Sequence, residues 1–123
     1  MGKKRILFIE DEPELVELMQ VRLTTSGYEM LSAYDGEEGL NKAQQERPDL
    51  ILLDVIMPKI DGLTLCRRLK DGLQTKHIPM IIISASGGKD LPERAQAAGA
   101  DELIIKPFGA EELLAKIKAL LGE

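Results

Sequence analysis

The chain has 123 residues, of which 44% are hydrophobic and 30% are charged. This length and balance are typical of one compact globular domain, and they exclude a disordered, collagen-like or membrane-embedded chain. Sixteen Lys and Arg residues against twenty-one Asp and Glu residues give a formal net charge of −5, which disfavours direct binding of nucleic acid. We therefore predict a single domain over residues 1–123, with no nucleic acid as its direct ligand.

The single cysteine, Cys66, excludes an internal disulfide and is typical of a protein in a reducing compartment. The first apolar run, residues 6–9, is too short for a membrane span or a signal-peptide core, and acidic residues follow it directly. We expect a cytoplasmic protein that does not insert into a membrane.

Five short segments have the length and composition of β-strands. Four of them are nearly continuous apolar runs, which are typical of parallel strands covered by helices on both faces of a sheet. The remaining segment, residues 28–33, is more mixed and is predicted to be an edge strand. The apolar runs are residues 6–9, 50–53, 78–83 and 103–105.

Each strand segment is followed by a segment with helical periodicity and helix-capping residues. The helix expected at 89–98 offers only three apolar residues for packing, so we predict that it is the helix that shifts most easily. Strict alternation of strands and helices predicts an α/β fold with a parallel sheet, helices on both faces and a ligand site beyond the carboxyl ends of the strands. The predicted helices are residues 12–26, a segment after Asp35, 63–70, 89–98 and 110–121.

Polar residues follow four of the five strand segments. Glu10 and Asp11 follow the first, Asp54 the third, Ser84 the fourth and Lys106 the fifth. Parallel strands bring these residues to one rim of the sheet, because their carboxyl ends meet there. Three carboxylates at one rim are oxygen ligands of the kind that Mg²⁺ prefers, and they would repel one another without a cation.

In this order and at these strand ends, the motifs resemble those of response-regulator receiver domains of two-component signalling. The resemblance covers essentially the whole chain and implies the flavodoxin-like (βα)5 doubly wound fold, with a five-stranded parallel sheet of order 2-1-3-4-5. The matching motifs are Ile9-Glu10-Asp11, Asp54-Val55-Ile56-Met57-Pro58 followed by Asp61-Gly62, Ser84-Ala85 and Lys106-Pro107-Phe108.

The resemblance implies that Asp54 accepts a phosphoryl group from a sensor histidine kinase or a histidine phosphotransfer protein. Lys106 would pair with this group, Ser84 would donate its hydroxyl to it, and the Lys106-Pro107 peptide bond is expected to be cis. Mg²⁺ is the implied cofactor. Its implied ligands are Glu10, Asp11, Asp54 and the backbone carbonyl of Ile56.

The expected output is a change in protein–protein contacts. The implied surface is formed by the helix at 89–98, the strand at 103–105 and the helix at 110–121, and it would contact a downstream protein or a second phosphorylated copy. The chain would catalyse its own phosphorylation and dephosphorylation, so we do not expect an enzyme in the ordinary sense.

Three alternatives are weighed against this interpretation. The chain could be a receiver excised from a longer multidomain regulator or a hybrid kinase, which the sequence does not decide. An aspartyl-nucleophile phosphatase needs a second acid two residues after the nucleophile, where this chain has Ile56. A flavin binder needs a phosphate-binding loop rich in glycine and hydroxyl groups after the first strand, where residues 10–14 are mostly acidic.

Two further expectations concern residues outside the motifs. Many receivers have an aromatic residue three positions before the active-site lysine, whereas this chain has Leu103, so we expect movement of Ser84 to be relayed mainly by residues 85–89 and the following helix. His77 is predicted to be a solvated loop residue and Cys66 a core residue.

Overall fold

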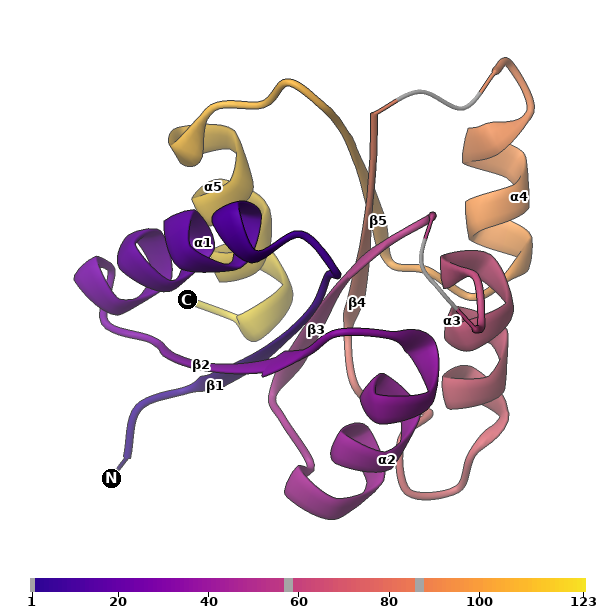
Figure 1. Cartoon of the computed structure of the whole chain (residues 1–123), viewed down its shortest axis with the longest axis horizontal. Helices are drawn as coiled ribbons and strands as arrows, with labels where there is room; N and C mark the ends of the chain where they lie inside the picture. The colour runs from indigo at the N-terminus through magenta and orange to yellow at the C-terminus, as the bar shows by residue number, and fades with distance from the viewer. Residues whose placement is uncertain (1, 57–58, 86–87) are drawn as a thin grey trace.

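The computed structural model describes residues 2–56, 59–85 and 88–123, in which five parallel strands form one central sheet (Figure 1). The order β2-β1-β3-β4-β5 is the predicted one, and β2 is an edge strand that pairs with β1. The strands are β1 (Arg5–Ile9), β2 (Glu29–Ala33), β3 (Leu50–Asp54), β4 (Met80–Ser84) and β5 (Glu102–Ile105).

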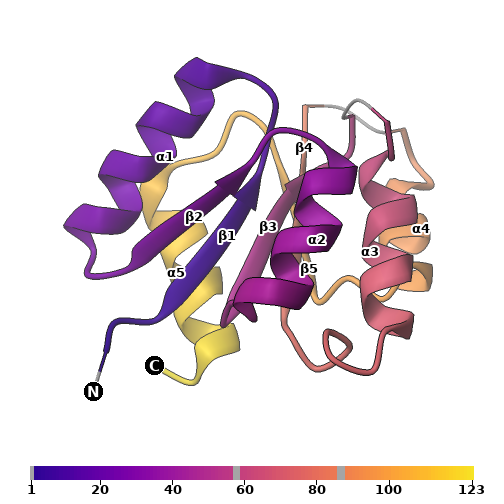
Figure 2. The same ribbon diagram turned by 60° about the horizontal axis from the view of Figure 1, so that its bottom comes forward.

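Helices cover both faces of the sheet. Helices α1 and α5 lie on one face, and α2, α3 and α4 lie on the other (Figures 1 and 2). In the described part of the chain, no helix is long and apolar enough to cross a membrane. The helices are α1 (Pro13–Thr25), α2 (Gly36–Glu46), α3 (Gly62–Asp71), α4 (Leu91–Ala97) and α5 (Ala110–Leu121).

The predicted alternation of strands and helices is confirmed, and the largest differences in boundaries lie beside prolines. Strand β4 begins at Met80 instead of residue 78, because Pro79 has no N–H to donate within a sheet. Helix α4 begins at Leu91 instead of residue 89, since Pro92 is tolerated in the first helical turn, where an N–H has no partner inside the helix.

Alternate residues of each central strand enter two separate cores. In β1, Ile6 and Phe8 pack on the side of α1 and α5, whereas Leu7 and Ile9 pack on the side of α2, α3 and α4. This division follows from the two-residue period of a strand, which points successive side chains to opposite faces. Cys66 lies in the core on the side of α2, α3 and α4 and is fully buried, as predicted.

Side-chain caps begin α2 and α3. The Asp35 carboxylate accepts a hydrogen bond of 2.8 Å from the Glu38 backbone N–H, and the Glu38 carboxylate accepts one of 2.6 Å from the Tyr34 N–H. Asp61 accepts a bond of 2.9 Å from the Thr64 N–H, which lowers the pKa of Asp61. These caps satisfy N–H groups that have no partner inside their helices.

Replacing Leu52 by alanine tests whether this residue belongs to the core. Leu52 lies in the middle of β3 and is fully buried, so Leu52→Ala should lower the free energy of unfolding by about 2–5 kcal/mol. Leu73 is 83% exposed, and Leu73→Ala should change the free energy of unfolding by less than about 0.5 kcal/mol. Urea unfolding measures both values. Equal losses in the two variants would contradict this assignment of the core.

Candidate phosphoacceptor site

The carboxyl ends of four strands bring charged and polar side chains together. Glu10 follows β1, Asp54 ends β3, Ser84 ends β4 and Lys106 follows β5. Ladder pairs of Asp54 with Ile83 and of Ser84 with Ile105 hold neighbouring strand ends in register. Glu10, Asp54 and Ser84 are only 1%, 8% and 2% exposed, so this rim is polar but largely removed from water.

Lys106 supplies the positive charge that faces these carboxylates. Its Nζ lies 2.8 Å from Oδ2 of Asp54 and 3.9 Å from Oε1 of Glu10. Burial alone would lower the pKa of Lys106, but the hydrogen bond to Asp54 and the charges of Asp54 and Glu10 outweigh burial and raise this pKa. The lysine therefore remains an ammonium group next to the predicted phosphoacceptor.

The Asp54 carboxylate is held in place through both of its oxygens. Oδ1 accepts a hydrogen bond of 3.0 Å from the backbone N–H of Ile56, and Oδ2 accepts the bond from Lys106. Helix α3 begins close to this strand end, since the Gly62 N–H donates to the Val55 carbonyl at 2.8 Å. A Cβ atom at position 62 would collide with the carbonyl oxygen of Asp54, so glycine is required there.

The environment of Glu10 strongly perturbs its carboxyl group. Burial, followed by its contact with the Asp54 carboxylate, raises the pKa of Glu10 from its ordinary value of 4.5 to about 8. A hydrogen bond of 3.2 Å from the Glu12 N–H and the charge of Lys106 oppose this rise without cancelling it. One lysine therefore does not neutralise two buried carboxylates, and a further cation or a proton is favoured beside Glu10.

The oxygen ligands at this rim fit Mg²⁺. The adjacent carboxylates of Glu10 and Asp54 match the one or two carboxylates by which proteins hold this ion, with waters completing its coordination. Asp11 is exposed at the same strand end. Over residues 2–56, 59–85 and 88–123, no group of three or more His, Cys, Asp or Glu side chains is arranged as a ligand set, so the metal roles of Asp11 and of the Ile56 carbonyl stay predictions.

Several other expectations can be compared with the structure. The Lys106-Pro107 peptide bond is cis. His77 is exposed, and burial raises the pKa of the Cys66 thiol to about 11, so both residues behave as predicted. Met57 and Pro58 of the Asp54 motif lie outside the described residues, as do residues 86 and 87 of the expected relay.

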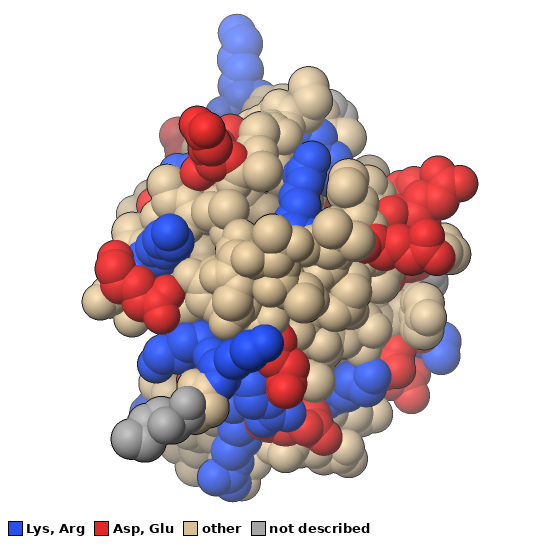
Figure 3. Space-filling view, turned by 90° about the vertical axis from the view of Figure 1, so that its left-hand side faces the viewer, with Lys and Arg blue, Asp and Glu red and all other residues tan. Residues whose placement is uncertain are grey.

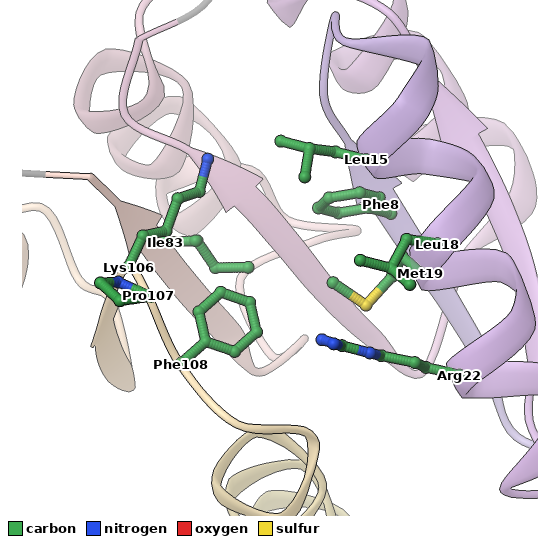
Figure 4. Close-up of a pocket in the computed structure, with 9 residues that line it drawn as sticks. All are labelled: Phe8, Leu15, Leu18, Met19, Arg22, Ile83, Lys106, Pro107 and Phe108. Atoms are coloured by element: carbon green, nitrogen blue, oxygen red, sulfur yellow. The ribbon is translucent and has the colours of Figure 1, made fainter.

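Sequence reasoning missed an apolar pocket of about 280 Å³ beside Lys106. In Figure 4, side chains of α1 face Phe108 and its neighbours across this pocket, and Arg22 points toward Phe108. Leu18 lies at the pocket and is 46% exposed. Uncharged side chains also occupy the centre of the face that carries α1 and α5 (Figure 3). The lining residues are Phe8, Leu15, Leu18, Met19, Arg22, Ile83, Lys106, Pro107 and Phe108.

The chain belongs to the response regulator receiver domain family, whose sequence model matches residues 6–118. This finding confirms the resemblance and identifies the class of the protein as the receiver domain of two-component response regulators, which is a phosphoacceptor signalling module. The parallel five-stranded sheet of order 2-1-3-4-5 agrees with this family and its flavodoxin-like fold.

Two curated relatives are transcriptional regulators. The chain is 41% identical over 119 residues to the DNA-binding dual master transcriptional regulator RpaA of Synechocystis sp., covering 95% of this chain and 48% of the relative. It is 41% identical over 118 residues to the alkaline phosphatase synthesis transcriptional regulatory protein PhoP of Bacillus subtilis, covering 96% and 48%. The chain thus spans about half the length of these relatives.

Three solved structures have closely similar folds. A CheY-like receiver domain protein of Methanospirillum hungatei has a TM-score of 0.92 at 29% identity, over 98% of this chain and 95% of that chain. Chemotaxis protein CheY4 of Vibrio cholerae has a TM-score of 0.90 at 28% identity, over 97% and 99%. The receiver domain of sensor histidine kinase PA1611 of Pseudomonas aeruginosa, described with magnesium in its active site cleft, has a TM-score of 0.91 at 26% identity, over 99% and 100%.

The raised pKa of Glu10 predicts how the stability of the metal-free protein depends on pH. Between pH 4.5 and about 8, folding takes up a proton at Glu10. The protonated Glu10 carboxyl therefore contributes its full share of the free energy of unfolding below pH 4.5, and this contribution is lost as the pH rises through 8. The uncharged variant Glu10→Gln lacks this loss. Its stability relative to the wild type should therefore increase from pH 5 to pH 8.

Urea unfolding in EDTA at both pH values measures this difference. Glu12→Gln is the control, because Glu12 is exposed at the same end of the sheet and should show no such trend. A Glu10→Gln difference that is the same at pH 5 and pH 8 would show that burial does not raise this pKa.

Proposed function

We propose that residues 1–123 form one receiver domain that acts as a phosphorylation-controlled switch in a two-component phosphorelay, with Asp54 as the phosphoacceptor. The observation that carries this proposal is the buried Asp54 carboxylate, oriented by the Ile56 N–H and paired with Lys106 beside Glu10. The donor is a phosphohistidine of a sensor histidine kinase or of a histidine phosphotransfer protein.

In the proposed reaction, a carboxylate oxygen of Asp54 attacks the phosphorus while the P–N bond to the donor imidazole breaks. The electron pair of that bond leaves with the imidazole, and the product is an aspartyl phosphate. Lys106 is close enough to Asp54 to pair with the phosphoryl oxygens, whose charge it would stabilise. The proposed role of Ser84 is to donate its hydroxyl to one of these oxygens from the end of β4.

We propose that Mg²⁺ is the cofactor of this reaction. When bound, the ion neutralises the carboxylates and the phosphoryl oxygens, so that an anionic nucleophile meets an anionic donor at lower cost. The raised pKa of Glu10 supports a cation at this position, as does the magnesium described for the related PA1611 receiver domain. The proposed ligands are Glu10, Asp11, Asp54 and the Ile56 carbonyl.

The phosphodonor has to approach Asp54 from the rim at which the strands end, so it covers surface next to Lys106. The apolar pocket between α1 and Phe108 lies there, and its rim carries the half-exposed Leu18. We propose that an apolar side chain of the kinase or phosphotransfer protein fills this pocket while its histidine faces Asp54. Burial of apolar surface would then stabilise the complex.

The proposed output surface is formed by α4, β5 and α5, and it binds a downstream protein or a second phosphorylated copy. Helix α4 follows the β4 end that carries Ser84, and three small or medium side chains pack it onto the sheet: Leu91, Ala95 and Ala98. A helix with so small an apolar face can shift at low energetic cost. The relative RpaA is named as a DNA-binding transcriptional regulator. The alternative proposal is therefore that this chain is a receiver module of a longer multidomain regulator or of a hybrid kinase.

The chain then works in the cytoplasm, where sensor kinases present their phosphohistidine. We propose no substrate other than the phosphodonor, since the chain catalyses its own phosphorylation and dephosphorylation. Loss of the phosphoryl group requires water to attack the aspartyl phosphate. The side chain of Ile56 is 78% exposed, two residues after Asp54, and would oppose this attack sterically.

Incubation with acetyl phosphate and Mg²⁺ should add one phosphoryl group to the chain. Hydroxylamine should remove this group, because hydroxylamine cleaves acyl phosphates. Asp54→Asn should abolish the adduct in intact-mass measurements. The matched control, Asp71→Asn, changes an exposed aspartate at the end of α3 and should be labelled like the wild type. An adduct that persists in Asp54→Asn would exclude Asp54 as the acceptor.

Mg²⁺ should raise the thermal unfolding temperature of the wild type relative to EDTA, since an ion that binds the folded state stabilises it by mass action. Asp11→Asn should reduce this increase, and Asp71→Asn should retain it. Differential scanning calorimetry at several Mg²⁺ concentrations measures the effect. The metal assignment is wrong if Asp11→Asn and the wild type respond equally.

Beryllofluoride with Mg²⁺, which mimics an aspartyl phosphate, tests the output surface. We expect backbone amide chemical shifts to change along α4 and β5 as well as at the site, because α4 is held by few side chains. Changes confined to residues at the strand ends would refute the α4–β5–α5 surface. Light scattering then distinguishes the two occupants, since a doubled mass indicates a homodimer and an unchanged mass a heterologous partner.

A further inference from the structure

A groove between α3 and α4 carries two arginines, and the phosphoacceptor site makes no use of it. Its wider part has a volume of about 420 Å³ and is lined by Arg67 of α3 and by Arg94 of α4. A second hollow of about 260 Å³ continues past Arg67 toward Gly99. Both hollows share Arg67, Ala97 and Ala98, so they form one open groove along the two helices. Figure 2 shows α3 and α4 side by side on the face opposite α1 and α5.

Both arginines are available to a ligand. Arg67 and Arg94 are exposed, and neither guanidinium group forms an ion pair or a side-chain hydrogen bond within residues 2–56, 59–85 and 88–123. Lys70 lines only the second hollow, where Asp101 neutralises it at 3.0 Å. Asp71 also lines the second hollow, so positive charge is concentrated in the wider part of the groove.

This local charge is opposite to that of the whole chain, whose formal net charge is −5. Two unpaired guanidinium groups from different helices face one groove, and each can hold a carboxylate through two parallel hydrogen bonds. Leu63 and the small residues Ala97 and Ala98 line the same groove, where they offer apolar contact and leave room for a ligand. An extended segment with carboxylates on either side of an apolar side chain fits this pattern.

We propose that the α3–α4 groove binds an acidic peptide segment of a partner protein, with Arg67 and Arg94 holding two of its carboxylates. A small phosphate compound fits less well, because the groove is open and its apolar lining residues would stay exposed to water. This binding does not require phosphorylation of Asp54, because none of the residues that line the groove belongs to the phosphoacceptor site.

Fluorescence anisotropy with the unphosphorylated full chain tests the proposal. The probe is a labelled peptide with two glutamates on each side of one leucine, flanked by glycines. We expect saturable binding that weakens in 0.5 M salt, because exposed charge pairs are screened. The same peptide with lysines in place of the glutamates should not bind. Lack of binding by the acidic peptide, or equal binding by the basic one, would overturn the proposal.

Three matched variants locate the binding site. Arg67→Gln and Arg94→Gln should each weaken binding about fivefold or more, since each removes one charged hydrogen-bonding partner. Arg68→Gln removes the same charge from the next residue of α3, which is exposed but does not line the groove, and should weaken binding less than twofold. Circular dichroism melts should be unchanged in all three. Equal weakening by Arg68→Gln would show that only the net charge matters.

Two further measurements distinguish other occupants. Pyrophosphate binding by calorimetry that depends on Arg67 and Arg94, without peptide binding, would assign the groove to a phosphate compound and overturn the proposal. A concentration-dependent dimer in sedimentation that Arg94→Gln abolishes would instead assign the groove to a second copy of the chain. Neither result bears on the phosphoacceptor role of Asp54, because no phosphodonor is present.

Discussion

The pairing of Lys106 with Asp54, beside the buried Glu10, is the interaction on which the rest of the site depends. A buried charge is costly unless it is paired, and here two carboxylates share one ammonium group. Burial, followed by the contact with the Asp54 carboxylate, raises the pKa of Glu10. The single ammonium group of Lys106 therefore faces two carboxyl groups, which is the arrangement on which the proposed binding of a divalent cation is based.

The fold creates this arrangement because parallel strands end together. The central strands β3 and β4 are buried along their whole length, so their side chains on both faces contribute to the two cores. The polar residues Asp54 and Ser84 are the last residues of these two strands, so they lie at the carboxyl end that the parallel strands share. Gly62 allows α3 to begin directly against the carbonyl of Asp54, the proposed phosphoacceptor.

The proposed switching mechanism follows from how unequally the helices are held. Helix α5 presents a longer apolar face to the sheet, including the fully buried Leu113 and Ile117, whereas α4 is a seven-residue helix with a small one. A rearrangement at Ser84 would therefore move α4 before it moves α5. The proposed acidic-peptide groove lies on the other side of α4, so a partner held there would contact the same helix from a different direction.

Much of this molecule was predictable from local sequence. Apolar runs of strand length, the cap at Asp35, and the alternation of strands and helices predicted the five-stranded sheet and its helical layers, because these signals depend on near neighbours in the chain. The same reasoning brought Glu10, Asp54, Ser84 and Lys106 to one rim, since parallel strands share their carboxyl ends. The prolines at positions 79 and 92 carried the signal for the shifted boundaries, which the apolar patterns alone did not contain.

Only the tertiary structure decided which charges meet and how far they are removed from water. Nothing local indicates that Lys106 lies 2.8 Å from Asp54 but 3.9 Å from Glu10, or that Glu10 is buried while Asp11, the next residue, is exposed. The pocket beside Phe108 and the groove with Arg67 and Arg94 are likewise formed by elements far apart in the chain. The physical reason is that burial, pKa and concave surfaces depend on distances between such elements, which packing sets and which the order of residues along one strand or helix does not contain.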